Sequence, residues 1–145
     1  MKNSWKLLPL LSVIFAVASH QPLAAEVAPT LPPTITIPSA QSEVTVRLEN
    51  QTPAAITYEA LGDTQPRLLT SGDDVLLQNL NTPTTLTFFY QDIQKNRQAG
   101  EGLLTAAIEV NEATGNLEVV VKPTTSLGSD VSNITIEPSG NVFVF

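Results

Sequence analysis

Residues 43–49 read EVTVRLE, and this stretch decides the fold class. Its apolar members, Val44, Val46 and Leu48, occupy every second position, with polar residues between them. A period of two places successive side chains on opposite faces of an extended chain, whereas a helix repeats its apolar residues every three to four positions. Residues 84–91, TTLTFFYQ, follow the same period. The sequence therefore predicts half-buried β-strands at both places, the second of them central in its sheet.

Turn-forming residues punctuate the rest of the chain. Clusters of Gly, Pro, Asn and Asp recur roughly every 8–12 residues, a spacing typical of β-sandwiches and barrels. After residue 25 no segment carries a helical stripe of apolar residues. We predict an all-β chain in which residues 41–145 form a single immunoglobulin-like β-sandwich, with a small β-barrel as the alternative. The other expected strands cover residues 56–60, 67–69, 75–80, 103–110, 117–122, 133–137 and 141–145. Glycine-containing turns at residues 112–116 and 138–140 predict that the last four of these strands form two hairpins.

The first 25 residues have the layout of a secretory signal peptide: a positively charged start, an apolar run at residues 7–18, and small residues before the cut. The apolar run of about 12 residues is shorter than the ~20 that a helix needs to cross a bilayer. We expect cleavage after Ala25, with a cut after Ala18 or an uncleaved anchor as the alternatives. Cleavage leaves no stable membrane span, so the protein is expected in the periplasm or outside the cell.

Residues 26–40 contain four prolines. Proline fixes the backbone dihedral φ and lacks an amide donor, so this segment is predicted to be an extended, Pro-rich lead between the signal peptide and the sandwich. Within it, Ile35 and Ile37 alternate with threonines, a pattern that also suits a strand at the edge of a sheet.

Composition excludes several kinds of chemistry. The 145 residues include no cysteine and one histidine, His20, which lies in the signal peptide. Sites that depend on these residues, such as serine-protease triads and structural zinc, are therefore excluded from the mature chain. Removal of residues 1–25 leaves 5 basic against 14 acidic residues, a net charge of −9. Binding to nucleic acid is not expected, because contact with phosphates requires a basic surface.

Three polar loops are the expected contact surface, because loops on a rigid scaffold usually carry recognition. The first is residues 92–102, the most polar stretch of the chain, which holds Lys95 and Arg97. The others are the turns at residues 62–66 and 71–74. We predict that these loops bind a protein or a component of the cell envelope.

Four charged residues in or beside the two turns are further binding candidates: Asp63, Arg67, Asp73 and Asp74. Arg67 suits a carboxylate or phosphate, since a guanidinium binds two oxygens at once, although pairing with Asp63 or Asp73 is the favoured interpretation. The three aspartates would hold calcium if the turns approached each other. Their spacing matches no EF-hand loop, and turn aspartates mostly bond their own backbone. No metal is therefore expected, and calcium binding is kept as an alternative.

Two other function classes are not expected. Glu109 and Glu118 are able to supply a carboxylate pair for glycoside hydrolysis, but such sites need aromatic platforms, and the mature chain has no Trp and two Tyr. We predict no catalytic residue and no cofactor. The chain ends in alternating apolar residues and Phe145, as outer-membrane barrels often do. Transmembrane strands need about 9–11 residues and two aromatic girdles, which the short strands and six mature aromatics do not supply.

Three stretches carry a resemblance: residues 46–52 (VRLENQT), 54–67 (AAITYEALGDTQPR) and 124–130 (TTSLGSD). Together they resemble small uncharacterised exported cyanobacterial β-sandwich proteins, over most of residues 44–145. The resemblance implies a Gram-negative-type envelope and carries no active site across.

These observations converge on an exported, non-enzymatic envelope protein that serves as an interaction module. Its partner is expected to be a protein or an envelope component. The alternative is a periplasmic protein that binds a small ligand or calcium.

Overall fold

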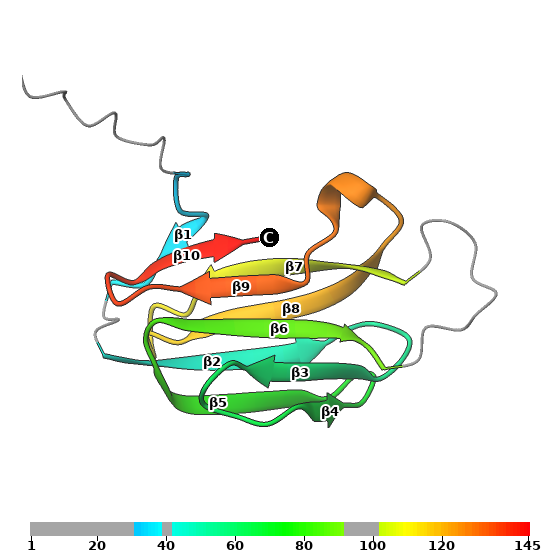
Figure 1. The fold of residues 1–145 in the computed structure, drawn as a ribbon, viewed down its shortest axis with the longest axis horizontal. Helices are drawn as coiled ribbons and strands as arrows, with labels where there is room; N and C mark the ends of the chain where they lie inside the picture. The colour runs from blue at the N-terminus through cyan, green and yellow to red at the C-terminus, as the bar shows by residue number, and fades with distance from the viewer. Residues whose placement is uncertain (1–30, 39–41, 92–101) are drawn as a thin grey trace, which may run out of the picture. The chain divides into compact units, whose positions relative to one another are not determined.

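The computed structural model describes residues 31–38, 42–91 and 102–145, and nearly all regular structure within them is β. The β-sandwich prediction is confirmed (Figure 1). One short 3-10 helix, η1, follows β8. The strands are β1 (Ile35–Thr36), β2 (Glu43–Asn50), β3 (Ile56–Ala60), β4 (Arg67–Leu69), β5 (Asp74–Asn81), β6 (Thr84–Tyr90), β7 (Leu103–Val110), β8 (Leu117–Thr124), β9 (Asn133–Ile136) and β10 (Asn141–Val144); η1 covers Leu127–Ser129.

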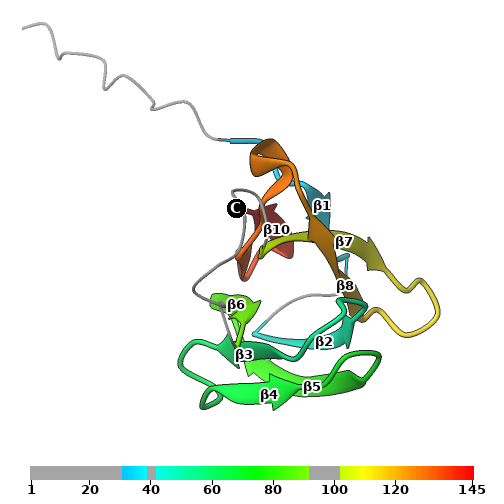
Figure 2. The same cartoon turned by 90° about the vertical axis from the view of Figure 1, so that its right-hand side faces the viewer.

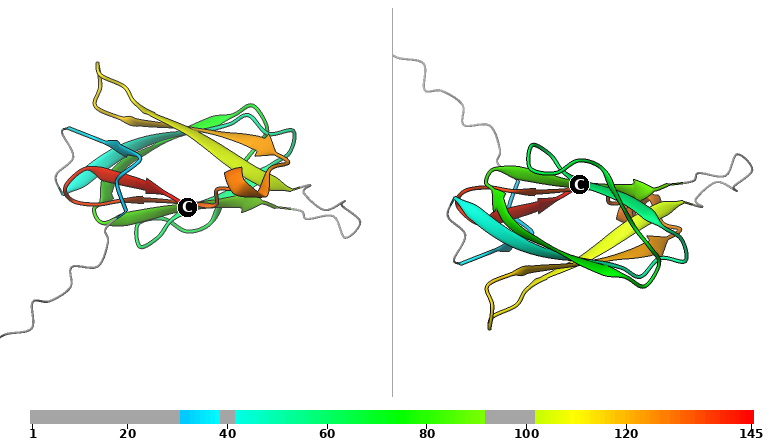
Figure 3. Two further views of the ribbon diagram at one scale, coloured as in Figure 1. Left: turned by 90° about the horizontal axis from the view of Figure 1, so that it is seen from above. Right: turned by 90° about the horizontal axis from the view of Figure 1, so that it is seen from below.

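The strands form two sheets. The six-stranded sheet has the order β1-β10-β9-β6-β3-β4, and the four-stranded sheet has the order β5-β2-β8-β7. Seen from above and below, the sheets lie as two layers (Figure 3). Among the described residues no ladder joins one sheet to the other, so the architecture is the sandwich and not the closed barrel of the alternative prediction.

Strand β6 shows how the period of two builds the core. It lies between β9 and β3, in the interior of the six-stranded sheet, as predicted. Leu86, Phe88 and Tyr90 are buried, whereas Phe89 between them is 52% exposed. The buried set meets the inward side chains of the other sheet, such as Leu48 on β2. Apolar residues at alternate positions of both sheets therefore form one core.

Strand pairing confirms the two predicted hairpins. β7 pairs with β8 and β9 with β10 in antiparallel fashion, as the glycine-containing turns at residues 112–116 and 138–140 indicate. Gly115 has a φ of 75°, which suits a residue without a Cβ atom. The pairing of β2 with β8 is parallel, with Leu48 beside Val119. No local sequence signal predicts this contact, because its two strands are distant in the chain.

Asn50 is a buried polar hub at the end of β2. Its side chain is fully buried, and its Nδ2 donates hydrogen bonds to the carbonyl oxygens of Ala54 and Leu69, each at 2.9 Å. Its Oδ1 accepts a hydrogen bond from the backbone N–H of Thr52, also at 2.9 Å. One side chain thus satisfies three backbone groups and ties the loop after β2 to β4.

Part of the Pro-rich lead belongs to the sandwich. β1 pairs with β10, and Ile37 just after it is 1% exposed. The backbone N–H of Thr34 donates to the carbonyl oxygen of Val142 at 2.8 Å, and that of Ile37 donates to Gly140 at 2.8 Å. The alternating Ile and Thr residues of this segment thus form a strand at the edge of the sheet, as their pattern predicted. The predicted signal peptide and residues 26–30 lie outside the described residues.

Candidate functional site

Of the loops predicted to form one contact surface, the turns at residues 62–66 and 71–74 lie at opposite ends of β5, whereas residues 92–101 lie outside the described residues. The carboxylate of Asp63 accepts hydrogen bonds from the backbone N–H of Asn81 at 3.0 Å and from its Nδ2 at 2.6 Å. Asn81 ends β5, whereas Asp74 begins it. A strand rises about 3.3 Å per residue, so the seven steps of β5 separate these ends by roughly 23 Å. These two turns therefore do not approach each other, and the calcium site that Asp63 was predicted to share with Asp73 and Asp74 is wrong.

The predicted pairing of Arg67 is also wrong. Arg67 lies exposed on β4, the outermost strand of its sheet, opposite Tyr58. Asp63 is bound by Asn81 instead, and Asp73 contributes its backbone carbonyl, which accepts a hydrogen bond from the N–H of Asn50 at 2.9 Å. Within the described part of the chain, Arg67 makes no salt bridge.

Two of the predicted binding residues, Lys95 and Arg97, lie outside the described residues. Across residues 31–38, 42–91 and 102–145, no group of three or more His, Cys, Asp or Glu side chains is placed to hold a metal ion.

Asp74 has an arginine partner that the sequence did not suggest. Arg47 Nε donates to Asp74 Oδ2 at 3.0 Å, and Arg47 Nη1 lies 3.7 Å from Glu118 Oε2. These three side chains come from β2, β5 and β8 and share the outer face of the four-stranded sheet. The hydrogen bond from Arg47, followed by its charge, lowers the pKa of the Asp74 carboxyl. The same contacts raise the pKa of Arg47.

Replacing Arg47 with glutamine is expected to raise the pKa of Asp74 toward its ordinary value. That pKa is lowered in the folded protein, so the ion pair of Arg47 with Asp74 stabilises the fold at pH values above the ordinary pKa of aspartate. This stabilisation is lost as the pH falls through the lowered pKa of Asp74. Carbon-detected NMR titration of the Asp74 carboxyl measures the change. Arg67→Gln is the control, and an equal rise in that variant would contradict the assignment.

A cleft opens where the edges of the two sheets meet. β1 ends the six-stranded sheet, β7 ends the four-stranded sheet, and both lie on the same side of the sandwich (Figure 2). The cleft between them has a volume of about 720 Å³. Its lining residues are Ile35, Thr36, Pro38, Glu109, Val110, Glu112 and Gly115.

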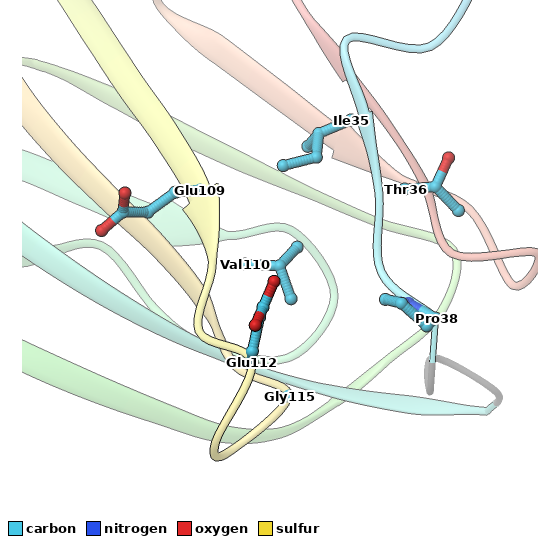
Figure 4. A pocket seen from close by; sticks show the side chains of 7 residues that line it. All are labelled: Ile35, Thr36, Pro38, Glu109, Val110, Glu112 and Gly115. Atoms are coloured by element: carbon cyan, nitrogen blue, oxygen red, sulfur yellow. The ribbon is translucent and has the colours of Figure 1, made fainter.

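The cleft has apolar walls and an acidic rim. Ile35 on β1 and Val110 on β7 point toward each other across it, and Glu112 stands beside Val110 at its mouth (Figure 4). Glu109 points to the other side of β7 (Figure 4). A smaller cleft of about 160 Å³ shares Gly115 and is lined by a further acidic residue, Glu43.

The cleft exists because β7 is incompletely covered. Leu104, Ala106, Ile108 and Val110 share the inward face of β7, but Leu104 alone is fully buried. The other three are partly buried and pack against the core from its margin. The opposing edge strand, β1, has two residues against the eight of β7, so it leaves most of the longer strand uncovered.

Glu109 and Glu118 form a neighbouring pair, but not in a cleft of the kind that glycoside hydrolysis needs. They lie directly opposite each other in the ladder between β7 and β8. Glu118 faces Arg47 on the outer side of the sheet, and cross-strand neighbours share a face. The pair therefore belongs to a solvated outer face, as the alternation of charged residues suggested.

Sequence reasoning missed the cleft because no motif marks it. Its apolar residues are ordinary strand positions, and their grouping depends on which strands occupy the sheet edges. The alternation in residues 34–37 and 103–110 was the available signal, but strand order is needed to bring these segments together.

Comparison with known proteins adds no family. Neither a protein-family model, nor a curated protein, nor a solved structure matches this chain. In the part of the chain that the structure describes, no helix is long and apolar enough to cross a membrane.

Proposed function

We propose that this protein is an exported, non-enzymatic interaction module that binds a partner protein through the cleft between β1 and β7. The observation that carries the proposal is the half-buried apolar margin of β7 beside an open cleft. Proteins seldom leave an edge strand of this length without cover, because an unpaired edge invites association. The signal-peptide layout of residues 1–25 supports export.

Charge indicates the kind of partner. The mature chain carries a net charge of −9, and Glu43, Glu109 and Glu112 border the two adjoining clefts. Complementary charge speeds the encounter of partners and disfavours those of like charge. We therefore expect a basic surface or segment on the partner.

A small cationic ligand is the second candidate. The cleft volume of about 720 Å³ falls within the range of roughly 300–1,000 Å³ that is usual for ligand sites. Such a ligand would raise the melting temperature of the purified protein, and the rise would continue logarithmically as the ligand concentration exceeds the dissociation constant. The protein-binding proposal is preferred, because β7 offers an extended edge rather than an enclosed cavity.

Site-specific photo-crosslinking in the native host tests the proposal. A photoreactive residue at Glu112, which is exposed at the mouth of the cleft, is expected to give a discrete adduct with one partner protein. The same residue at Lys122, exposed on β8, is the control and is expected to give none. Absence of a Glu112 adduct, or identical adducts from both positions, would count against the cleft as the binding site.

A further inference from the structure

The backbone of β7 has a definite pattern along its free edge. In an antiparallel ladder, residues alternate between those whose N–H and C=O groups face the neighbouring strand and those whose groups face away. The N–H of Asn111 donates to Asn116 at 2.9 Å, which places Asn111 among the residues that bond across the hairpin. Since the orientation alternates along the register of β7 and β8, every second residue before Asn111 also bonds to β8. The residues between them, Ala106, Ile108 and Val110, direct their N–H and C=O groups away from β8.

The start of this edge is already used by the chain itself. The N–H of Leu104 donates to Asp130 Oδ1 at 3.0 Å, and the carbonyl oxygen of Leu104 accepts a hydrogen bond from the N–H of Val131 at 2.7 Å. Leu104 therefore belongs to the same alternate residues of β7, whose N–H and C=O groups face away from β8, as the hairpin bond also indicates. Residues 130–131 thus bond to the free edge of β7 at Leu104 alone.

Beyond Leu104 the edge continues uncovered. Within the described residues, no strand pairs with the outer side of β7, and no turn or loop bonds to the outward groups of Ala106, Ile108 and Val110. The side chains of these three residues face the core but are partly exposed. Space for a further strand and unpaired groups for its hydrogen bonds therefore occur together.

We propose that the partner supplies an extended, basic segment that adds to the four-stranded sheet beside β7. This inference rests on the proposed function and specifies its mode of recognition. The added strand bonds the backbone of residues 106–110, and alternate side chains enter the cleft toward Ile35. Lys or Arg side chains of the segment lie near Glu112 at the mouth of the cleft and near Glu109 on the outer face of β7 (Figure 4).

Charge argues against a second copy of this chain as the occupant. Antiparallel pairing of two β7 edges would bring Glu109 and Glu112 of both copies to one interface, and like charges across a ladder are destabilising. A basic segment meets the same carboxylates with opposite charge. The acidic residues at the cleft therefore favour a basic segment of another protein over a second copy of this chain.

Proline at position 108 separates backbone recognition from side-chain contact. The N–H of Ile108 faces away from β8, so Ile108→Pro removes a donor from the free edge without removing a bond of the β7–β8 ladder. Ile108→Ala is the matched control, because it loses the same side chain and keeps the N–H. Thermal unfolding and circular dichroism establish that each variant is folded.

The probe is a displayed library of random 12-residue peptides, selected on the wild-type protein at low salt. We expect enriched peptides with apolar residues at alternate positions and flanking Lys or Arg. Fluorescence anisotropy is expected to show at least tenfold weaker binding to Ile108→Pro than to Ile108→Ala. The double variant Glu109→Lys and Glu112→Lys keeps the backbone edge intact and is also expected to weaken binding at least tenfold. N-methylation of the peptide backbone at alternate residues is expected to weaken binding to the wild-type protein by the same factor.

Two results would overturn strand addition. One is the absence of enriched peptides, and the other is equal affinity of the enriched peptides for Ile108→Pro and Ile108→Ala. If Ile108→Pro does not fold, insensitivity to N-methylation is the overturning result instead. The crosslink from position 112 distinguishes failure of strand addition from failure of the proposed function. If strand addition is overturned but the crosslinked adduct forms, the protein binds a partner at the cleft by another mode. If no adduct forms, both proposals are overturned.

Discussion

Replacement of Phe88 with alanine is expected to lower the free energy of unfolding by about 3–5 kcal/mol, as for other large-to-small substitutions in close-packed cores. Phe88 is fully buried and has the largest side chain among the residues with no exposed surface. It lies on β6 between β3 and β9, so neighbouring strands limit how far the core is able to collapse into the space left behind. Urea unfolding followed by circular dichroism measures the loss.

Phe89 supplies the matched control, because it is the same residue type at the next position. Its side chain is 52% exposed on the outer face of the sheet. Phe89→Ala is therefore expected to change the free energy of unfolding by no more than about 0.5 kcal/mol. A one-residue slip in the register of β6 would exchange the two faces of the strand. Equal losses for the two variants, or a larger loss for Phe89→Ala, would contradict the register described above.

Asn50→Ala is expected to lower the free energy of unfolding by about 2–4 kcal/mol. The substitution removes the side-chain partner of the Leu69 carbonyl oxygen and of the Thr52 N–H, whereas the Ala54 carbonyl oxygen keeps its hydrogen bond from Thr52 Oγ1 at 2.7 Å. A buried polar group that loses its partner costs roughly 1–3 kcal/mol. Water that enters the space left by the side chain forms hydrogen bonds with these groups and so lowers their combined cost. The midpoint of urea unfolding is expected to fall while the m-value stays unchanged.

Gln51→Ala is the control for Asn50. Gln51 is exposed, and its side chain donates a hydrogen bond to Glu49 at the surface. We expect this variant to unfold within about 0.5 kcal/mol of the wild type. If Asn50→Ala were as stable as Gln51→Ala, the buried hub would not contribute the stability that its three hydrogen bonds indicate.

Local pattern was sufficient to predict the strands and two of the hairpins. The alternation in residues 43–49 and 84–91 specified both the strand type and the inward face, because the side-chain period of a strand is two. Gly115 and Gly140, both at positive φ, marked turns where a glycine is favoured. In these segments, local conformational preference and burial favour the same structure.

The candidate site depended on information that local pattern does not carry. Arg47 meets Asp74 because β2 and β5 are neighbours, and Asp63 is distant from Asp74 because β5 separates them. The cleft exists because β1 and β7 are the edges of different sheets. Each of these facts follows from strand order, which is set by packing between segments far apart in the chain.

The pairing of β1 with β10 also orders the events of folding. It joins Ile35 to Val142, so one of the earliest segments of the sandwich to be synthesised pairs with one of the last. Contacts between distant segments form slowly, because the entropy of closing the intervening chain opposes them. We therefore expect the β1 wall of the cleft to form late. If the cleft binds the proposed partner, a nascent or partly folded chain is expected to lack a complete binding surface.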